Sequence, residues 1–264
     1  MPQTRFADVR RFGSIDSTNR YLIEEARAGA PEGVVAVADH QTAGRGRLGR
    51  SWEAPAGANL LLSVLLRPAI GPGERHLATT TVALAALDAI GVVDPRTATD
   101  VSIKWPNDLV ESSGRKLAGV LAEADLVSAV AAGVLQPPVV VGIGVNVNWP
   151  ATDADLPPEL VGLAVSLRQM IGVPVDREAL LAALLAALEP RAADLDSVAG
   201  RARLAEDMAT HCSTMGTRVR VDLPDGSFEG TATGISPEGH LVVTTGKATR
   251  TVVAGDVVHV RPGS

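Results

Sequence analysis

The chain has 264 residues, of which 46% are hydrophobic and 20% charged, a composition typical of a globular protein rather than a disordered or fibrous one. A net charge of −6 argues against a general nucleic-acid-binding protein, which would carry a strong basic excess. Cys212 is the only cysteine, which excludes an internal disulfide and zinc sites of the Cys₄ or Cys₂His₂ kind.

The first third of the chain predicts alternating helices and strands. A helix begins at Ser17, Thr18 or Asn19, which are good capping residues, and ends before Gly29. Strands rich in valine or leucine follow at residues 34–40 and 59–67, and an alanine-rich buried helix at residues 76–90. The N-terminus has no apolar signal region, and no apolar run reaches the roughly 18–20 residues of a membrane span. We therefore expect a cytoplasmic protein without a membrane partner.

Further strands are expected at residues 101–105, 116–126 and 139–148, divided by Pro, Asn, Asp and Gly. A helix is expected over residues 177–196, with Pro190 breaking it. From Thr217 onward, short strands alternate with PDG, PEG and TGK turns, which is typical of a small β-barrel or sandwich. We therefore expect two domains: a mixed α/β domain at residues 1–213 and an all-β domain at residues 214–264.

The run GRGRLG at residues 44–49 satisfies the pattern G-x-G-x-x-G of dinucleotide-binding turns. That fold needs a strand before the glycines, a helix opening at the last glycine and an acidic residue about 20 positions further on. Only the strand is present here. Pro55 and Gly57 precede another strand instead of a helix, and residues 63–66 contain no carboxylate. We therefore exclude a nicotinamide-dependent oxidoreductase.

Three arginines distinguish this loop: Arg45, Arg47 and Arg50. Guanidinium groups bind phosphate or carboxylate through paired hydrogen bonds, and the glycines allow the backbone to approach a ligand closely. The loop therefore predicts an anion clamp that orders when its ligand binds. The alternative is a mobile, solvated basic turn.

Polar residues also stand at the ends of later strands. Pro106 stops a strand in KWPNDL and leaves Asn107 and Asp108 where they could contact a base, a ribose or an amine; the alternative is a turn closing a hairpin. Lys116 opens the strand in GRKLAGVLAE and could pair with a carboxylate or phosphate; the alternative is an exposed strand-end charge.

The segment GIGVNVN at residues 142–148 contains two asparagines. Asn146 and Asn148 alternate with valines, which predicts that both amides face one side of a strand. Buried amides need polar partners, so we expect hydrogen bonds from the protein or a ligand there.

Together and in this order, these segments resemble the biotin–protein ligases. The resemblance rests on STN, QTAGRGRLGRSW, GANLLLS, KWPNDL, GRKLAGVLAE and VVVGIGVNVN, which begin at residues 17, 41, 57, 104, 114 and 139. It covers nearly all of the first domain, and the last domain is similar to that family's small barrel. The resemblance implies an α+β fold: a mixed β-sheet catalytic domain with flanking helices, of the class II synthetase-like biotinyl–lipoyl ligase kind, followed by an SH3-like β-barrel.

The resemblance also implies an activity. Such enzymes activate the carboxylate of biotin with ATP and Mg²⁺, release pyrophosphate, and form biotinyl-5′-AMP. They then transfer biotin to a lysine of the biotin carboxyl carrier domain of acyl-CoA or pyruvate carboxylases. No protein ligand for a metal is assigned.

Residue roles follow from the same resemblance. Biotin would be bound by Ser17, Thr18, Asn19, Gln41, Gly44, Arg45, Gly46, Arg47, Lys116 and Gly119. ATP would be bound by Arg47, Arg50, Trp52, Asn107, Asp108, Lys116, Asn146 and Asn148. Arg47 and Lys116 would be catalytic through their charge at the reacting carboxylate and phosphate. Asp108 would orient or deprotonate the incoming lysine.

Two alternative functions stay close to this one. A lipoate– or octanoate–protein ligase would share the fold, but KWPND and the arginine-rich loop favour biotin. A biotin-sensing transcriptional regulator would carry an N-terminal winged helix-turn-helix. Here STN begins at Ser17, which leaves no room for one, and the chain is acidic. We therefore expect no DNA partner.

Overall fold

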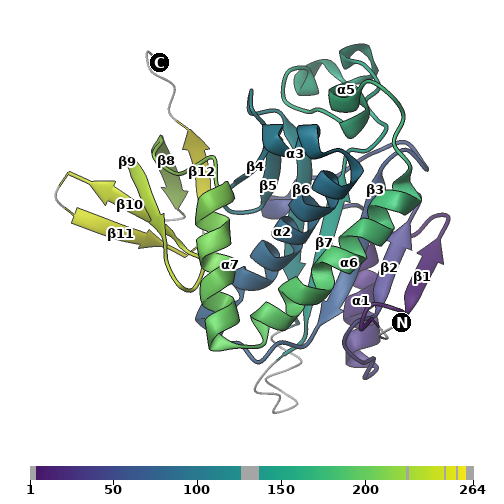
Figure 1. Cartoon of the computed structure of the whole chain (residues 1–264), viewed down its shortest axis with the longest axis horizontal. Helices are drawn as coiled ribbons and strands as arrows, with labels where there is room; N and C mark the ends of the chain where they lie inside the picture. Colours follow the sequence, from purple (N-terminus) through teal and green to yellow (C-terminus); the bar gives the residue numbers. More distant parts are fainter. Residues whose placement is uncertain (1–3, 126–136, 224–225, 247, 254, 260–264) are drawn as a thin grey trace.

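A seven-stranded mixed sheet forms the centre of the first domain (Figure 1) in the computed structural model, which describes residues 4–125, 137–223, 226–246, 248–253 and 255–259. The strand order is β1-β2-β3-β7-β6-β5-β4, with β1 and β2 parallel and the other neighbours antiparallel. The strands are β1 (Val9–Phe12), β2 (Val35–Ala38), β3 (Leu60–Leu66), β4 (Val101–Lys104), β5 (Asp108–Glu111), β6 (Lys116–Glu123) and β7 (Val139–Val145).

Helices cover both faces of this sheet. One lies on the first face, and a layer of three long helices covers the second, in front of the sheet in Figure 1. The first helix is α1, and the three are α2, α6 and α7. The described helices are α1 (Thr18–Arg27), α2 (His76–Val93), α3 (Pro95–Asp100), α5 (Leu167–Ile171), α6 (Arg177–Leu195) and α7 (Val198–His211).

Strand β3 shows why both faces must be covered. Its residue Leu65 packs with Leu22 of α1, whereas Leu62 and Leu66 belong to the larger core that includes Leu77 of α2. A strand buried on both faces is largely apolar, and in β3 only Ser63 interrupts the run of leucine and valine. Helix α1 packs mainly on β2, β3 and β7 and leaves part of the same face, over β6 and β7, to other residues.

The C-terminal domain is a five-stranded antiparallel sheet with the order β11-β10-β9-β8-β12. Every second residue of its strands is buried on one face of the sheet, as is usual when only one face packs on a core. Val219, Val221 and Val243 are examples. The strands are β8 (Arg218–Leu223), β9 (Gly226–Ile235), β10 (Leu241–Thr245), β11 (Ala248–Val252) and β12 (Asp256–His259).

The two domains meet around Trp105, whose side chain is only 1% exposed. Its backbone nitrogen donates to the Thr214 hydroxyl at 3.1 Å, and its indole nitrogen donates to the Gly239 carbonyl at 3.1 Å. The His259 Nε2 atom also lies 3.1 Å from the Thr214 hydroxyl. The segment KWPND is therefore held at one end by the C-terminal domain.

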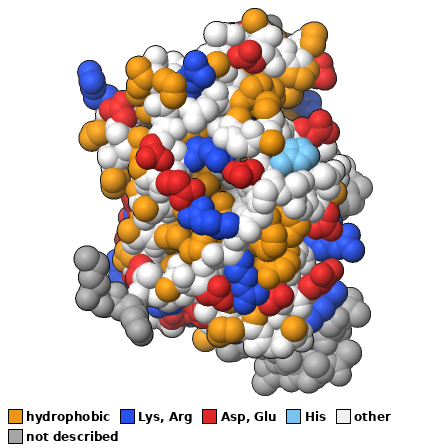
Figure 2. All heavy atoms as spheres, turned by 90° about the vertical axis from the view of Figure 1, so that its right-hand side faces the viewer, with side chains coloured by type: hydrophobic (Ala, Val, Ile, Leu, Met, Phe, Trp, Pro, Cys, Tyr) orange, Lys and Arg blue, Asp and Glu red, His pale blue; other side chains and the backbone are white. Residues whose placement is uncertain are grey.

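Surface charges are paired across the outer edge of the sheet. Figure 2 shows basic and acidic side chains interspersed on the face around β1 and α1. Exposed pairs on this side include Arg11 with Glu178 at 2.7 Å and Arg10 with Glu25 at 2.6 Å. Such pairs contribute at most about 1 kcal/mol each, so the fold depends on its core.

The prediction that Pro190 breaks a helix was wrong. Helix α6 continues through Pro190 to Leu195. A proline inside a helix removes one hydrogen bond and costs about 3 kcal/mol. That cost is offset because α6 packs along α2 through buried leucines, including Leu180, Leu184 and Leu188. Packing between helices therefore keeps α6 continuous, and this packing cannot be read from the residues around Pro190 alone.

The expectation that no apolar run is long enough to span a membrane also needs correction. The segment Pro72–Val93 forms a helical stretch of 22 residues with a mean hydropathy of 1.6, enough by length and composition. In the structure, 72% of its most apolar window is buried inside the protein. Its position between the sheet and α6 accounts for that apolar character.

The strand expected over residues 116–126 ends earlier, at Glu123, and residue 126 itself lies outside the described residues. The strand expected over residues 139–148 ends at Val145. Strands β1 and β5 and helix α7 were not predicted. The two strands have only four residues each, which is too short for a clear pattern.

The burial of His76 predicts that the protein loses stability as the pH falls. Burial, together with His240 and Arg47, lowers its pKa to about 4. In the unfolded chain it takes a proton near its ordinary pKa of about 6.5. As pH falls between these two values, the unfolded state therefore binds more protons and stability decreases. Urea unfolding at several pH values is expected to show a shallower decline for His76→Leu than for the wild-type protein. An equally steep decline in His76→Leu would contradict this account.

Thr214→Val is expected to destabilise the contact between the domains. The substitution preserves shape but removes the acceptor of the buried Trp105 nitrogen. A buried donor without a partner costs about 1–3 kcal/mol. Chemical unfolding should show a loss of that size for Thr214→Val and little change for Thr214→Ser, which keeps the hydroxyl. Equal stability of the two variants would show that this hydrogen bond is unimportant.

Candidate active site

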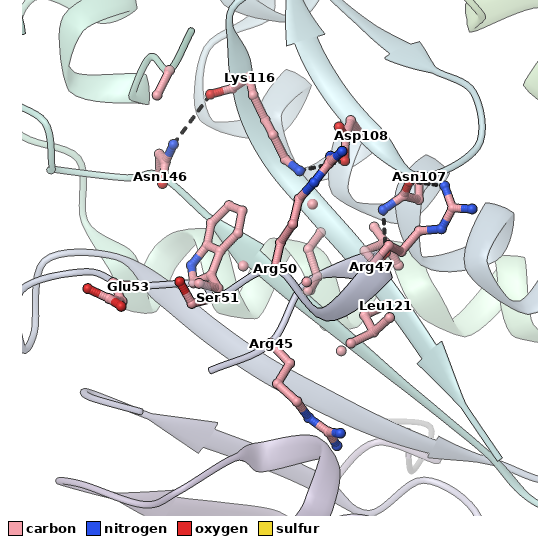
Figure 3. Close-up of a pocket in the computed structure, with 18 of the residues that line it drawn as sticks. Arg45, Arg47, Arg50, Ser51, Glu53, Asn107, Asp108, Lys116, Leu121 and Asn146 are labelled. Atoms are coloured by element: carbon pink, nitrogen blue, oxygen red, sulfur yellow. Dashed lines mark hydrogen bonds and ion pairs between the residues drawn. The ribbon is translucent and has the colours of Figure 1, made fainter. Parts of the chain in front are cut away.

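A cavity of about 520 Å³ lies on the face of the sheet that α1 leaves partly uncovered. Its walls come from the start of α1, the glycine–arginine loop, the β4–β5 hairpin and strands β6 and β7 (Figure 3). Leu160 and Leu163, which lie far along the chain, add an apolar rim. Val257 of β12 brings the C-terminal domain into the wall.

The floor of the cavity consists of glycines on two paired strands. Gly119 of β6 stands opposite Gly144 of β7, and Gly142 stands opposite Leu121. A Cβ atom on Gly142 would lie 2.3 Å from the Asn19 Oδ1 atom, so a side chain is excluded there. The missing side chains leave room for polar groups to reach the sheet surface.

The start of α1 forms the polar end of the cavity. Ser17 caps the helix, and Thr18 donates to the Gln41 Oε1 atom through its backbone nitrogen at 2.8 Å and its hydroxyl at 3.0 Å. The Ser63 hydroxyl donates to the Asn19 Oδ1 atom at 2.6 Å. The helix N-terminus adds a partial positive charge. These buried groups fix the geometry of the polar end.

The three loop arginines lie against three different walls. Arg45 pairs with Glu123 at 2.9 Å, at the end where Asn19 also donates to Glu123. Arg47 donates to the Asn107 side-chain oxygen at 3.2 Å and to the Gly255 carbonyl at 3.1 Å. Figure 3 shows Arg45 directed away from the other two.

Arg50 extends toward Lys116 and Asp108 in Figure 3. Lys116 and Asp108 form an ion pair, with the Nζ and Oδ1 atoms 2.7 Å apart but without the angles of a hydrogen bond. Both side chains are about a third exposed, at 36% and 26%, so a ligand can reach them. Asn107 is fixed beside them because its amide donates to the Val120 carbonyl at 2.8 Å.

A buried carboxylate, Glu111, holds the hairpin that leads to Lys116. Burial would raise its pKa, but hydrogen bonds from Ser113 and Arg115 outweigh this and lower the pKa to about 2. The carboxylate therefore stays ionised and keeps the hairpin closed. Sequence reasoning missed Glu111, although a glutamate just before SSGR at a strand end is a possible signal.

Two of the predicted site residues lie outside the cavity lining. Gly44 instead closes the base of the loop: its carbonyl accepts from Trp52, and a Cβ atom would lie 2.4 Å from the Trp52 carbonyl oxygen. The Asn148 amide binds the Val175 backbone on both sides, at 2.8 and 2.9 Å. The geometry therefore does not support contact of Asn148 with a nucleotide.

Strand alternation does not reach Asn148, because β7 ends at Val145. Asn146 does line the cavity, but its amide donates to the backbone of Lys116 and Val165. The remaining predicted residues all line the cavity: Ser17, Thr18, Asn19, Gln41, Arg45, Gly46, Arg47, Arg50, Trp52, Asn107, Asp108, Lys116 and Gly119.

Several lining residues were not predicted. Lys104 and Glu53 are charged, Gly142 and Gly144 form the floor, and Val257 comes from the other domain. GIG in the segment VVVGIGV is the sequence signal for the floor, whereas nothing local marks Val257. Within the described part of the chain, no group of three or more His, Cys, Asp or Glu side chains could hold a metal ion.

Comparison with known proteins identifies the family to which the chain belongs. Residues 12–146 match the biotin/lipoate A/B protein ligase family, and residues 214–260 match the biotin protein ligase C-terminal domain. The biotin–[acetyl-CoA-carboxylase] ligase of Mycobacterium tuberculosis is 38% identical over 93% of this chain and 86% of its own length. That of Paracoccus denitrificans is 34% identical over 90% of this chain and 94% of its own.

The fold agrees with these matches. A biotin protein ligase from Aquifex aeolicus, solved in complex with biotin and ATP, superposes with a TM-score of 0.79 at 26% identity and covers 97% of this chain and 100% of its own. The expected mixed-sheet domain with an appended β-domain is thereby confirmed. The chain belongs to the biotin protein ligases, the biotin–[acetyl-CoA-carboxylase] ligases of the biotin/lipoate protein ligase family.

Proposed function

We propose that this chain joins biotin to ATP as biotinyl-5′-AMP and then transfers biotin to a lysine of a biotin carboxyl carrier domain. The observation that carries the proposal is the cavity itself. It brings Lys116, Arg47 and Arg50 together over a glycine floor, with a helix N-terminus at one end. The biotin and ATP of the Aquifex aeolicus complex support the same pair of substrates here.

The first step joins two anions. A carboxylate oxygen of biotin attacks the α-phosphorus of ATP, and the bond to pyrophosphate breaks. Positive groups placed where the charges meet stabilise that transition state and reduce their repulsion. Lys116 is suited to the carboxylate because it already holds a carboxylate, that of Asp108, at 2.7 Å. Biotin would take the place of Asp108 as its partner.

Arg47 is suited to the phosphate because its guanidinium is held from two sides, by Asn107 and by the Gly255 carbonyl. A group fixed before the reaction costs little reorganisation during it. Ser17, Thr18 and Gln41 would bind the ring of biotin at the polar end, and Arg45 would close that end through its pair with Glu123.

The second step releases AMP. The amine of the acceptor lysine attacks the acyl carbon, the acyl–phosphate bond breaks, and one proton leaves the nitrogen. Asp108 would take or orient that proton once Lys116 has turned to the substrate, since its carboxylate faces the cavity. Lys116 and Arg47 would stabilise the departing phosphate.

Mg²⁺ would accompany the triphosphate. Phosphate oxygens are ligands of the kind that Mg²⁺ prefers. The acceptor would be the carrier domain of an acyl-CoA or pyruvate carboxylase, and the enzyme would act in the cytoplasm. The domain limits stay at residues 1–213 and 214–264, supported by the end of α7 at His211 and the start of β8 at Arg218.

Biotin and lipoate can be distinguished directly. Purified protein, ATP and a carrier domain are incubated with biotin or with lipoate, and the mass of the carrier is measured. We expect the mass gain of one biotinyl group with biotin and no gain with lipoate. A gain with lipoate alone would overturn the assignment of the substrate.

Arg47→Ala and Lys116→Ala are each expected to lower the rate of adenylate formation by about 100-fold or more, since each removes a charge aimed at the transition state. Pyrophosphate release measures the rate, and thermal unfolding confirms that the fold is intact. Arg203→Ala, on the exposed face of α7, is the matched control and should keep full activity. Near wild-type release by either cavity variant would reject its role.

The loop is expected to be protected by its ligands. Trypsin should cut rapidly between Arg45 and Arg50 in the free protein, because this segment is largely exposed. Biotin and ATP together should slow that cleavage, since the arginines would be bound to the substrates. Equal rates with and without ligands, followed by mass spectrometry of the fragments, would contradict closure.

A further inference from the structure

We propose that Glu123 is a positioning residue for biotin: its carboxylate fixes the direction of the Asn19 amide, so that the polar end of the cavity offers an oxygen acceptor to the ligand. This inference rests on the proposed function and deepens it, because it concerns how the same cavity selects an acid that carries N–H groups.

Glu123 is the last residue of β6 and lies just behind the polar end. Among the described residues, those that line the cavity include Asn19 but not Glu123. The two carboxylate oxygens of Glu123 have different partners. Oε1 accepts from Arg45 at 2.9 Å, and Oε2 accepts from the Asn19 Nδ2 atom at 2.7 Å. Glu123 would therefore act on a ligand through Asn19 and not by direct contact.

The amide nitrogen of Asn19 faces two acceptors. Besides Glu123, the Leu121 carbonyl lies 3.1 Å from Nδ2. A carboxylate and a carbonyl only accept hydrogen bonds, so the nitrogen lies on this side and the oxygen on the other. The bond to the carboxylate is the shorter one, and a charge-assisted bond is about twice as strong as a neutral one. Glu123 is therefore the main group that sets the direction of the amide.

The amide oxygen of Asn19 lies at the floor of the cavity. A Cβ atom on Gly142 would lie 2.3 Å from the Asn19 Oδ1 atom, and the Ser63 hydroxyl donates to the same oxygen at 2.6 Å. A carbonyl oxygen has two lone pairs, so Oδ1 can accept a second hydrogen bond from a ligand in the cavity.

The neighbouring hydroxyls would also permit the opposite direction of the amide. The Ser63 hydroxyl lies 2.7 Å from the Thr18 hydroxyl, so its single hydrogen could turn to Thr18 if the Asn19 nitrogen took the place of the oxygen. The polar end would then present N–H groups. The urea of biotin also carries two N–H groups, whereas the ring of lipoate carries none. Donors that face each other lose their hydrogen bonds, which weakens binding.

The first test measures biotin binding by calorimetry without ATP. We expect the dissociation constant for biotin to rise by at least about tenfold in Glu123→Leu, since the charge-assisted bond to Asn19 is lost. Glu123→Gln keeps an oxygen for the Asn19 nitrogen and should stay within about threefold of the wild-type protein. The kcat of adenylate formation at saturating biotin and the KM for ATP should not change, because Glu123 acts on biotin alone.

Asp125→Leu is the matched control. Asp125 also joins this end of β6 to α1, through Arg27 at 2.6 Å, but at the opposite end of the helix from Asn19. We expect its dissociation constant for biotin to stay at the wild-type value. Equal losses in Asp125→Leu and Glu123→Leu would overturn the inference, because a general loosening of α1 would then explain both.

The other outcomes separate this inference from the function. An unchanged dissociation constant in Glu123→Leu overturns the inference alone, since the Leu121 carbonyl would then suffice. A loss in Glu123→Gln as large as in Glu123→Leu overturns it too, because the direction of the amide would not be the cause. If the wild-type protein binds no biotin, the proposed function fails as well, and the carrier-domain assay reports that activity independently.

A second pair of variants tests the contact even if Glu123→Leu fails to fold. Asn19→Asp places a second carboxylate against Glu123 and should remove most of the biotin binding. Adding Glu123→Gln gives the new carboxylate an amide donor, and the double variant should bind biotin at least about tenfold more tightly than Asn19→Asp alone. No recovery in the double variant would show that the two side chains are not coupled and would overturn the inference.

Discussion

The site depends on a stretch of sheet surface that carries no side chains. α1 protects one part of its face of the sheet, and Gly119, Gly142 and Gly144 keep the adjoining part low. On an ordinary strand, the side chains at these positions would fill the space where the cavity lies. The fold therefore creates a binding site where side chains are missing from the sheet surface.

The charges arranged over this surface are balanced before any substrate arrives. Lys116 is paired with Asp108, and Arg45 with Glu123. Arg47 donates to the Asn107 side-chain oxygen and to the Gly255 carbonyl. Lysine and arginine side chains without acidic partners would repel one another and destabilise the loop. The acidic partners reduce the repulsion between the cations, and an anionic substrate can take the place of these partners.

The sequence could predict the main elements from their apolar patterns, and the family resemblance pointed to fourteen of the residues that line the cavity. It could not predict which wall each loop arginine contacts, since that depends on the path of a loop with few internal bonds. It could not show that Asn148 lies beyond the strand, because the end of β7 at Val145 has no clear local signal. Nor could it show that Gly44 packs on the Trp52 backbone, because a close approach to backbone looks the same in sequence as a close approach to a ligand.

The contribution of β12 has a consequence for the newly made chain. Val257 lines the cavity and the Gly255 carbonyl binds Arg47, yet both residues are translated more than a hundred residues after the floor at Gly142 and Gly144. β12 pairs with β8, so this wall forms only when the C-terminal sheet closes. A chain translated only as far as Val145 would contain every strand of the central sheet but not the carbonyl that Arg47 binds. The cavity wall is therefore complete only once translation has passed Val257.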